Sequence, residues 1–149
     1  MIHNEIDLEH HLLFTAFKNK YIDPRNPIST QELISNLMIN YPHVFQSSLK
    51  ISYTISMLKT DGLIYENQVL DVEAFNKCVE DMKQKHKRMG EDRVKKECLR
   101  KLGYKSIILP TEPGVIEFCN RVSKYITDRV TKTNTIILDV CKTYQTQPL

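Results

Sequence analysis

The stretch from Ser29 to Ile64 constrains the fold most, because it carries start and end signals for two consecutive helices. Ser29-Thr30-Gln31-Glu32 has the pattern of a capping box, in which the Ser29 hydroxyl accepts the Glu32 amide hydrogen and the Glu32 side chain reaches back. The apolar residues that follow recur at helical spacing up to Met38. Tyr41-Pro42 ends this segment, since a residue before proline avoids the helical region. We therefore expect a short helix here.

A second helix follows within the same stretch. Ser47 or Ser48 can cap it, and its apolar stripe is Leu49 or Ile51, followed by Ile55 and Leu58. Gly62 should end the helix, since the residue after a helix commonly takes the left-handed conformation that glycine adopts at little cost. Leu63-Ile64-Tyr65 then changes to the alternating character of a strand.

The flanking segments are mainly helical in pattern. Residues 6–21 form an amphipathic repeat that ends at two prolines. A long helical pattern covers about 71–102, where Gly90 divides it into two segments, and Ser106-Ile107-Ile108-Leu109 predicts a short strand. A last long helix is expected over about 113–144.

Positive charge is concentrated in one part of the chain. Residues 83–105 hold 10 Lys/Arg against 3 Asp/Glu, a net of +7, whereas residues 1–82 hold 6 against 11, a net of −5. Such a segment suits a surface that neutralises phosphates, although a charge run is also the ordinary composition of a solvated helix face.

The four cysteines lie about twenty residues apart, without the close pairs that zinc sites use. Each falls among apolar neighbours and no signal peptide opens the chain, so we expect reduced, mostly buried thiols. No apolar run approaches the roughly 18 residues needed to span a bilayer. The sequence therefore predicts an intracellular protein, in the cytoplasm, nucleoid or nucleus, without a membrane segment.

Two pieces of the chain resemble winged helix-turn-helix regulators of the MarR and PadR type. Residues 51–64 resemble their recognition-helix region, ending in Leu-x-x-x-Gly-Leu-Ile, and residues 107–114 resemble the return strand of the wing and its Leu-Thr-Glu-x-Gly turn, with Pro110 inserted. The resemblance implies a mainly α fold: a winged helix-turn-helix with a small β-hairpin wing and a long C-terminal helix.

Some forty residues separate the two wing strands here, where those regulators have a loop. Either a helical insertion interrupts the wing, which we favour, or a small hairpin at 64–72 is the wing and the second match is fortuitous. We expect a single domain over 1–149: a helix-turn-helix core at 1–70, a basic helical insertion at 71–105, and the return strand with a C-terminal dimerisation helix at 106–149.

This layout predicts a surface for double-stranded DNA, with the second helix of the motif in the major groove and the basic insertion on backbone phosphates. Tyr104 and Lys105 would belong to the wing. The candidate DNA-binding residues are Ser48, Lys50, Ser52, Tyr53, Ser56, Lys59, Lys83, Lys85, Lys87, Arg88, Arg93 and Lys105. The helix has no Arg, so it offers no bidentate contact to guanine.

The last helix has the length and spaced apolar stripe of a dimerisation helix, which the resemblance also implies, so we expect a homodimer. The stripe comprises Val115, Phe118, Val122, Ile126, Val130 and Ile137. The same stripe could instead pack within one chain. We prefer the dimer because a 30-residue helix would be roughly 45 Å long.

No motif recommends an enzyme. Neighbouring His10 and His11 point about 100 degrees apart on a helix and cannot share a metal ion, so we expect no catalytic residues, no metal and no cofactor. We expect sequence-specific binding of duplex DNA, as a transcriptional regulator or a replication or partition factor. A winged-helix protein–protein adaptor and a helical RNA-binding protein are the alternatives.

Overall fold

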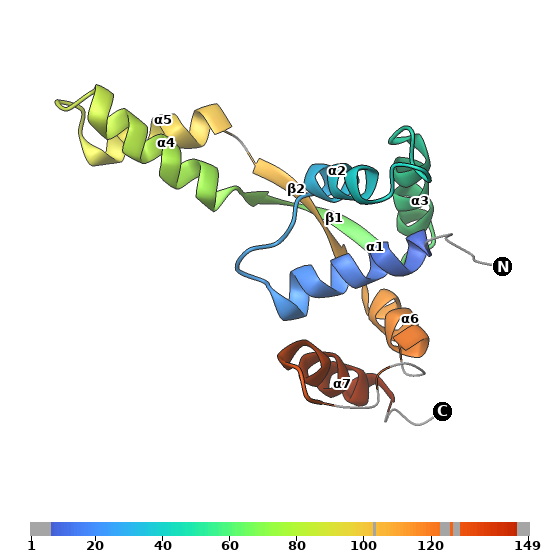
Figure 1. Cartoon of the computed structure of the whole chain (residues 1–149). Helices are drawn as coiled ribbons and strands as arrows, with labels where there is room; N and C mark the ends of the chain where they lie inside the picture. The colour runs from blue at the N-terminus through green and yellow to red at the C-terminus, as the bar shows by residue number, and fades with distance from the viewer. Residues whose placement is uncertain (1–6, 103, 123–125, 127–128, 146–149) are drawn as a thin grey trace. The chain divides into compact units, whose positions relative to one another are not determined.

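The computed structural model describes residues 7–102, 104–122, 126 and 129–145. The chain begins with α1 (Leu8–Phe17), which continues into the π-helical turn η1 (Lys18–Ile22), and then forms α2 (Thr30–Asn40) and α3 (Leu49–Thr60) (Figure 1). Asp7 caps α1 by accepting a hydrogen bond from the His10 amide. The three helices occupy the segments in which helices were expected.

The Ser29 cap and the Gly62 stop, which frame the predicted helix pair, both form. The Ser29 hydroxyl accepts the Glu32 amide hydrogen at 3.1 Å and begins α2. Gly62 has a φ of 75°, and the amides of Gly62 and Leu63 donate to the Lys59 and Leu58 carbonyls. These two bonds form the Schellman motif that ends a helix at a left-handed residue.

Two strands form one two-stranded sheet: β1 (Ile64–Leu70) pairs with β2 (Tyr104–Pro110). Between them in sequence lie α4 (Val72–Lys85) and α5 (Glu91–Leu102), so the helical segment separates two paired strands, as in the first of the two alternatives. The described residues are mainly helical, which confirms the mainly α fold class with a small two-stranded sheet.

The chain divides into two compact units, whereas a single domain was expected. Unit 1 comprises Met1–Asn67 and Ile107–Leu149, and unit 2 comprises Gln68–Ser106. The boundary falls within both strands, because α4 and α5 pack on each other and none of their described side chains belongs to the core of unit 1.

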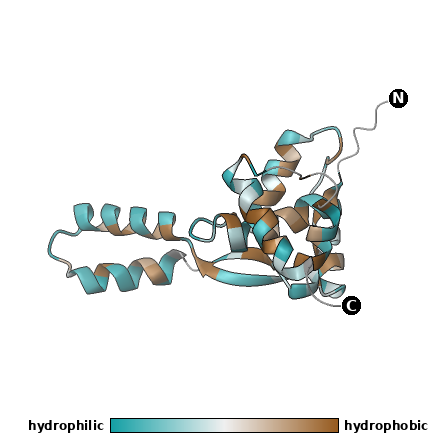
Figure 2. Ribbon diagram, turned by 90° about the horizontal axis from the view of Figure 1, so that it is seen from below, coloured by the Kyte–Doolittle hydropathy of each residue, from teal (hydrophilic) through white to brown (hydrophobic). Residues whose placement is uncertain are grey.

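Unit 1 holds the main core. Its most deeply buried large side chains come from α1, α3, β1, β2 and α6, among them Phe17, Leu12, Ile51, Ile108 and Phe118. Figure 2 shows hydrophobic residues concentrated in unit 1, while most residues of α4 and α5 are hydrophilic.

Buried Asn19 ties three parts of unit 1 together. It is 3% exposed, and its side chain donates to the carbonyls of Ile28 and Ile108 and accepts the Ile28 amide hydrogen. The role of Asn19 was not predicted from the sequence, since its partners lie 9 and 89 positions away.

The single helix expected over about 113–144 is two helices in the structure, α6 (Glu112–Val122) and α7 (Lys132–Gln145). The two contact each other. The Thr131 hydroxyl accepts the Asn134 amide hydrogen at 3.0 Å, so α7 has an N-cap of its own.

The stripe assigned to dimerisation is used largely within the chain. Val115, Phe118, Val122 and Ile137 are buried in the core of unit 1, and Ile126 packs partly buried against it, while Val130 is 87% exposed. The length argument for a homodimer therefore no longer applies, and the homodimer stays a prediction.

All four cysteines form disulfides, so the expectation of reduced thiols is wrong for this structure. Cys78 pairs with Cys98 across α4 and α5, and Cys119 pairs with Cys141 across α6 and α7. In each case two helices that follow one another run side by side, which places residues 20 and 22 positions apart at the same level.

No helix in the described ranges combines the length and apolar character needed to cross a bilayer.

Candidate nucleic-acid interface

Helix α3 is anchored to unit 1 by one face. Ile51, Ile55 and Leu58 are 0%, 4% and 1% exposed and belong to the main core. Thr54 lies on the same face, and its buried hydroxyl donates to the Lys50 carbonyl at 2.8 Å. Full burial of a large aliphatic side chain contributes about 1.5–3 kcal/mol, so this face fixes the rotation of the helix.

The opposite face of α3 is open to solvent. All six candidate DNA-binding residues in this region are exposed: Ser48, Lys50, Ser52, Tyr53, Ser56 and Lys59. The sequence of α3 contains no carboxylate and two lysines. A helix that presents hydroxyls and cations without a negative charge is suited to a polyanion.

Lys59 is partly engaged within the chain. Its ammonium group lies 2.9 Å from a Glu66 carboxylate oxygen on β1. Both side chains are well exposed, and a surface ion pair of this kind contributes only about 0–1 kcal/mol. Lys50 makes no ion pair with any described residue, so it is the freer of the two cations on α3.

Leu49 and Thr60 also lie on the open face, and sequence analysis did not assign them to it. Leu49 is 76% exposed, which resolves the choice between Leu49 and Ile51 in favour of Ile51 as the core residue. The helical spacing of Ile51, Ile55 and Leu58 with Thr54 could have shown this. Thr54 concealed the pattern because a hydroxyl that bonds to its own helix counts as polar in the sequence.

A groove of about 380 Å³ runs beside α3, at the start of α1. Leu8, Val44, Phe45 and Met57 give it an apolar lining, and Asp7, Glu9, Lys50 and Tyr53 supply polar groups. Asp7 and Glu9 lie 3.8 and 3.5 Å from the Arg121 guanidinium. Burial acts to lower the pKa of Arg121, but the hydrogen bond and charge of Glu117, with smaller contributions from Asp7 and Glu9, raise it on balance. The Arg121 cation thus offsets part of the negative charge here.

The second set of candidate residues lies in unit 2, where α4 and α5 pack side by side and a short turn joins them (Figure 1). Lys85, Lys87, Arg88 and Arg93 line a shallow hollow of about 410 Å³ at this turn, together with His86 and Met89. We call these residues the basic tip. None of its four Lys/Arg side chains forms an ion pair with a described carboxylate.

The remaining basic candidates of unit 2 differ from the basic tip. Lys83 lies 3.4 Å from Glu91, which Lys95 also approaches at 3.7 Å. The hydrogen bond from Lys83 and the charges of both lysines lower the pKa of Glu91. Lys105 is half-buried on β2. Among the basic candidates of unit 2, the four of the basic tip are thus the ones that are both exposed and without an ion pair to a described carboxylate.

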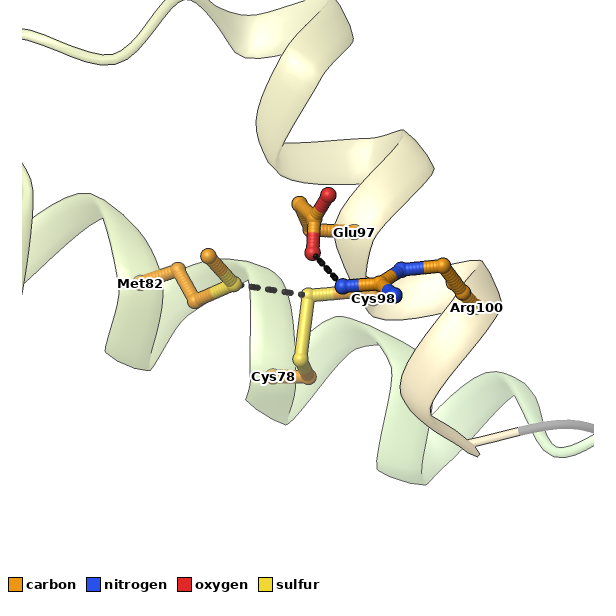
Figure 3. Close-up of a disulfide and its surroundings, with 5 residues drawn as sticks. All are labelled: Cys78, Met82, Glu97, Cys98 and Arg100. Carbon is orange, nitrogen blue, oxygen red and sulfur yellow. Dashed lines mark hydrogen bonds and ion pairs between the residues drawn. A yellow bond between two sulfur atoms is a disulfide. The ribbon is translucent and has the colours of Figure 1, made fainter.

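A disulfide holds the two helices that carry the basic tip (Figure 3). Val94 and Cys98 are fully buried, while the described apolar side chains of α4 are at most half-buried. Met82 Sδ lies 3.6 Å from Cys98 Sγ, a contact between sulfur atoms because a disulfide sulfur carries no proton. With so small a core, the covalent link is a main element of the pairing of α4 and α5.

Apart from Lys83 and Lys105, the candidates thus form two sets, one on α3 in unit 1 and one at the basic tip in unit 2. Neither protein-family models nor curated proteins nor solved structures gave a match to this chain.

Proposed function

We propose that this chain binds double-stranded DNA as a winged helix-turn-helix protein, serving as a transcriptional regulator or a replication or partition factor. One observation carries the proposal: the open face of α3 has two lysines, several hydroxyls and no carboxylate, and it stands opposite a fully buried face. An α-helix fits the major groove, which is about 12 Å wide. In this proposal Lys50, Tyr53 and Ser56 contact bases and phosphates.

Unit 2 supplies the contacts that do not depend on base sequence. The basic tip has four cations that form no ion pair with a described carboxylate, and phosphates are the natural ligands of such a group. The strands β1 and β2 would serve as the wing, with Tyr104 and Lys105 on β2 close to the sugar–phosphate backbone of the DNA.

A protein–protein adaptor is the second candidate, and the groove beside α3 favours it. Its apolar lining and partly neutralised carboxylates suit an amphipathic helix of a partner better than they suit a phosphate chain. The two proposals make opposite predictions for nucleic-acid binding.

The test compares duplex DNA, duplex RNA and single-stranded DNA of equal length, labelled with a fluorophore, in anisotropy titrations at 50 mM salt. The DNA proposal predicts the tightest binding for duplex DNA. The double variant Tyr53→Ala/Ser56→Ala should lose affinity for a preferred sequence more than for a random one. Absence of binding to all three would favour the adaptor, and a preference for duplex RNA would favour the RNA-binding alternative.

Binding to cellular DNA implies an intracellular site of action, which is part of this proposal. Disulfides are rare in such compartments, so the two cysteine pairs stand against it. Rapid alkylation of thiols in intact cells, followed by peptide mapping, decides the point. Alkylated Cys78 and Cys98 in the protein from these cells would support the intracellular location. Intact disulfides in the same sample would oppose it.

A further inference from the structure

Two large apolar side chains stand on the open face of α3, in line with the proposed DNA surface. Leu49 is 76% exposed and Tyr53 is 67% exposed, and the two are one helical turn apart. Ser56 and Thr60 continue the same row along the helix, which places all four opposite the buried Ile51 and Ile55. Single exposed apolar residues are common, but a pair aligned on a candidate binding face indicates a contact with a ligand.

We propose, on the basis of the DNA-binding function above, that Leu49 and Tyr53 read the 5-methyl groups of thymines in the major groove. The preferred site would then be rich in A·T pairs, with thymines at positions that the two side chains reach. This makes Leu49 a specificity-determining residue and assigns base selection to apolar contact rather than to hydrogen bonding.

The polar groups on this face cannot make the selection by themselves. The face has no Arg, Asn or Gln, so it lacks the planar fork of arginine that fits guanine and the amide contacts that fit adenine. Its two lysines offer guanine only a flexible point charge. The Ser56 and Thr60 hydroxyls both donate and accept, and they therefore tolerate any base edge. The thymine methyl is the apolar group of the major groove, and it matches what Leu49 and Tyr53 offer.

The spacing of the two side chains fits the duplex. Residues four apart on a helix are separated by about 6 Å along its axis, and base pairs are stacked about 3.4 Å apart. Leu49 and Tyr53 can therefore reach methyl groups on bases roughly two steps apart. The two lysines of α3 and its lack of carboxylates complement the phosphates on either side, which favours DNA over a protein partner at this face.

The test isolates the methyl group. Preferred duplexes are first selected by the full chain from a random-sequence library, and the best duplex is then synthesised with thymine and with deoxyuridine at every T position. Uracil keeps the hydrogen-bonding edge of thymine and lacks only the methyl. Removal of one contacted methyl should weaken binding about fourfold, and removal of two roughly 15-fold.

Two variants test the assignment to residues. Leu49→Ala and Tyr53→Ala should weaken binding to the thymine duplex and bring the ratio of the two affinities toward one. Ile39→Ala is the matched control, because Ile39 is a similarly exposed apolar residue on α2, 73% accessible, and it should leave the ratio unchanged. Circular dichroism verifies that each variant is folded.

The outcomes separate this inference from the function on which it rests. Equal affinities for thymine and uracil duplexes, a selection without A·T preference, or an unchanged ratio in Leu49→Ala and Tyr53→Ala would each overturn the inference and leave DNA binding intact. If the ratio of thymine-duplex to uracil-duplex affinity is unchanged in these variants, Leu49 and Tyr53 would instead be candidates for contact with a protein partner. Failure to bind any duplex would overturn the proposed function itself.

Discussion

Gly114 on α6 lies against Leu63 so closely that a Cβ atom added to Gly114 would come within 1.8 Å of the Leu63 carbonyl oxygen. Thr111 strengthens the same junction, since its amide donates to the Leu63 carbonyl and its hydroxyl to the Gly62 carbonyl. The Thr111 hydroxyl also accepts the Gly114 amide hydrogen at the start of α6. The end of α3 is therefore fixed to a segment some fifty residues later.

Gly114→Ala should destabilise unit 1 by about 3 kcal/mol or more, because the new methyl meets backbone atoms that cannot move independently. Urea denaturation followed by circular dichroism measures the loss. Gly90→Ala is the matched control, since nothing lies within 4 Å of the Cβ added there. Equal stabilities of the two variants would show that α6 is not seated against Leu63.

Asn19→Leu should lower the free energy of unfolding by about 2–4 kcal/mol. The variant leaves the buried Ile108 carbonyl and two groups of Ile28 without their partner, and each unsatisfied buried group costs about 1–3 kcal/mol. The exposed residue Asn36 on α2 provides a control, as Asn36→Leu should change stability little. A loss for Asn19→Leu no larger than for the control would contradict the assigned network.

His10 should make stability depend on pH. Burial lowers its pKa from the ordinary 6.5, although Asp7 acts in the opposite direction, and its ring stacks on Phe118 with centroids 5.8 Å apart. The unfolded chain then binds a proton more readily than the folded one. The stabilisation is therefore complete above pH 6.5 and falls as the pH drops from 6.5 through the folded pKa.

The measurement for His10 is the free energy of unfolding of the wild type and of His10→Gln between pH 7.5 and pH 5. The advantage of the wild type over the variant should shrink toward acid. An advantage that stays constant over this range, or grows, would show that His10 is not the group that titrates.

The two disulfides should differ in their rate of reduction. Cys78 is half-buried and open to attack by a thiolate, whereas Cys119 and Cys141 are 1% and 4% exposed. Thiol exchange requires access to a sulfur atom, so Cys78–Cys98 should be reduced first by dithiothreitol. Timed alkylation and peptide mapping follow both pairs. Simultaneous reduction of both, or earlier reduction of Cys119–Cys141, would contradict this order.

The sequence allowed prediction of the parts of the fold that depend on local signals. The Ser29 cap, the Gly62 stop and the division near Gly90 are encoded in residues a few positions apart. The pairing of β1 with β2 was one of two open alternatives, because strand patterns do not identify their partner. Among the candidate sites, the exposed residues of α3 followed from periodicity alone.

The features that sequence analysis missed depend on contacts that periodicity does not encode. An apolar stripe has the same spacing whether it packs on another chain or within its own chain, so it did not identify its packing partner. The spacing is also the same in one helix or two, so the division into α6 and α7 was missed. The Thr131 cap was its local signal, within what had been taken as a polar patch. The cysteine pairs and the bonds of Asn19 require knowledge of which elements lie side by side.

The most direct test of DNA binding is the dependence of affinity on salt for a duplex of about 30 base pairs, from 50 to 200 mM. The account predicts binding that weakens steeply with salt, since each phosphate contact contributes about 0.9 to the slope of log K against log salt. The variant Lys85→Gln/Lys87→Gln/Arg88→Gln should reduce the slope by about 2–3, while Lys18→Gln/Lys132→Gln should leave it unchanged. Absence of binding at 50 mM salt, or a slope that the basic-tip variant does not alter, would contradict it.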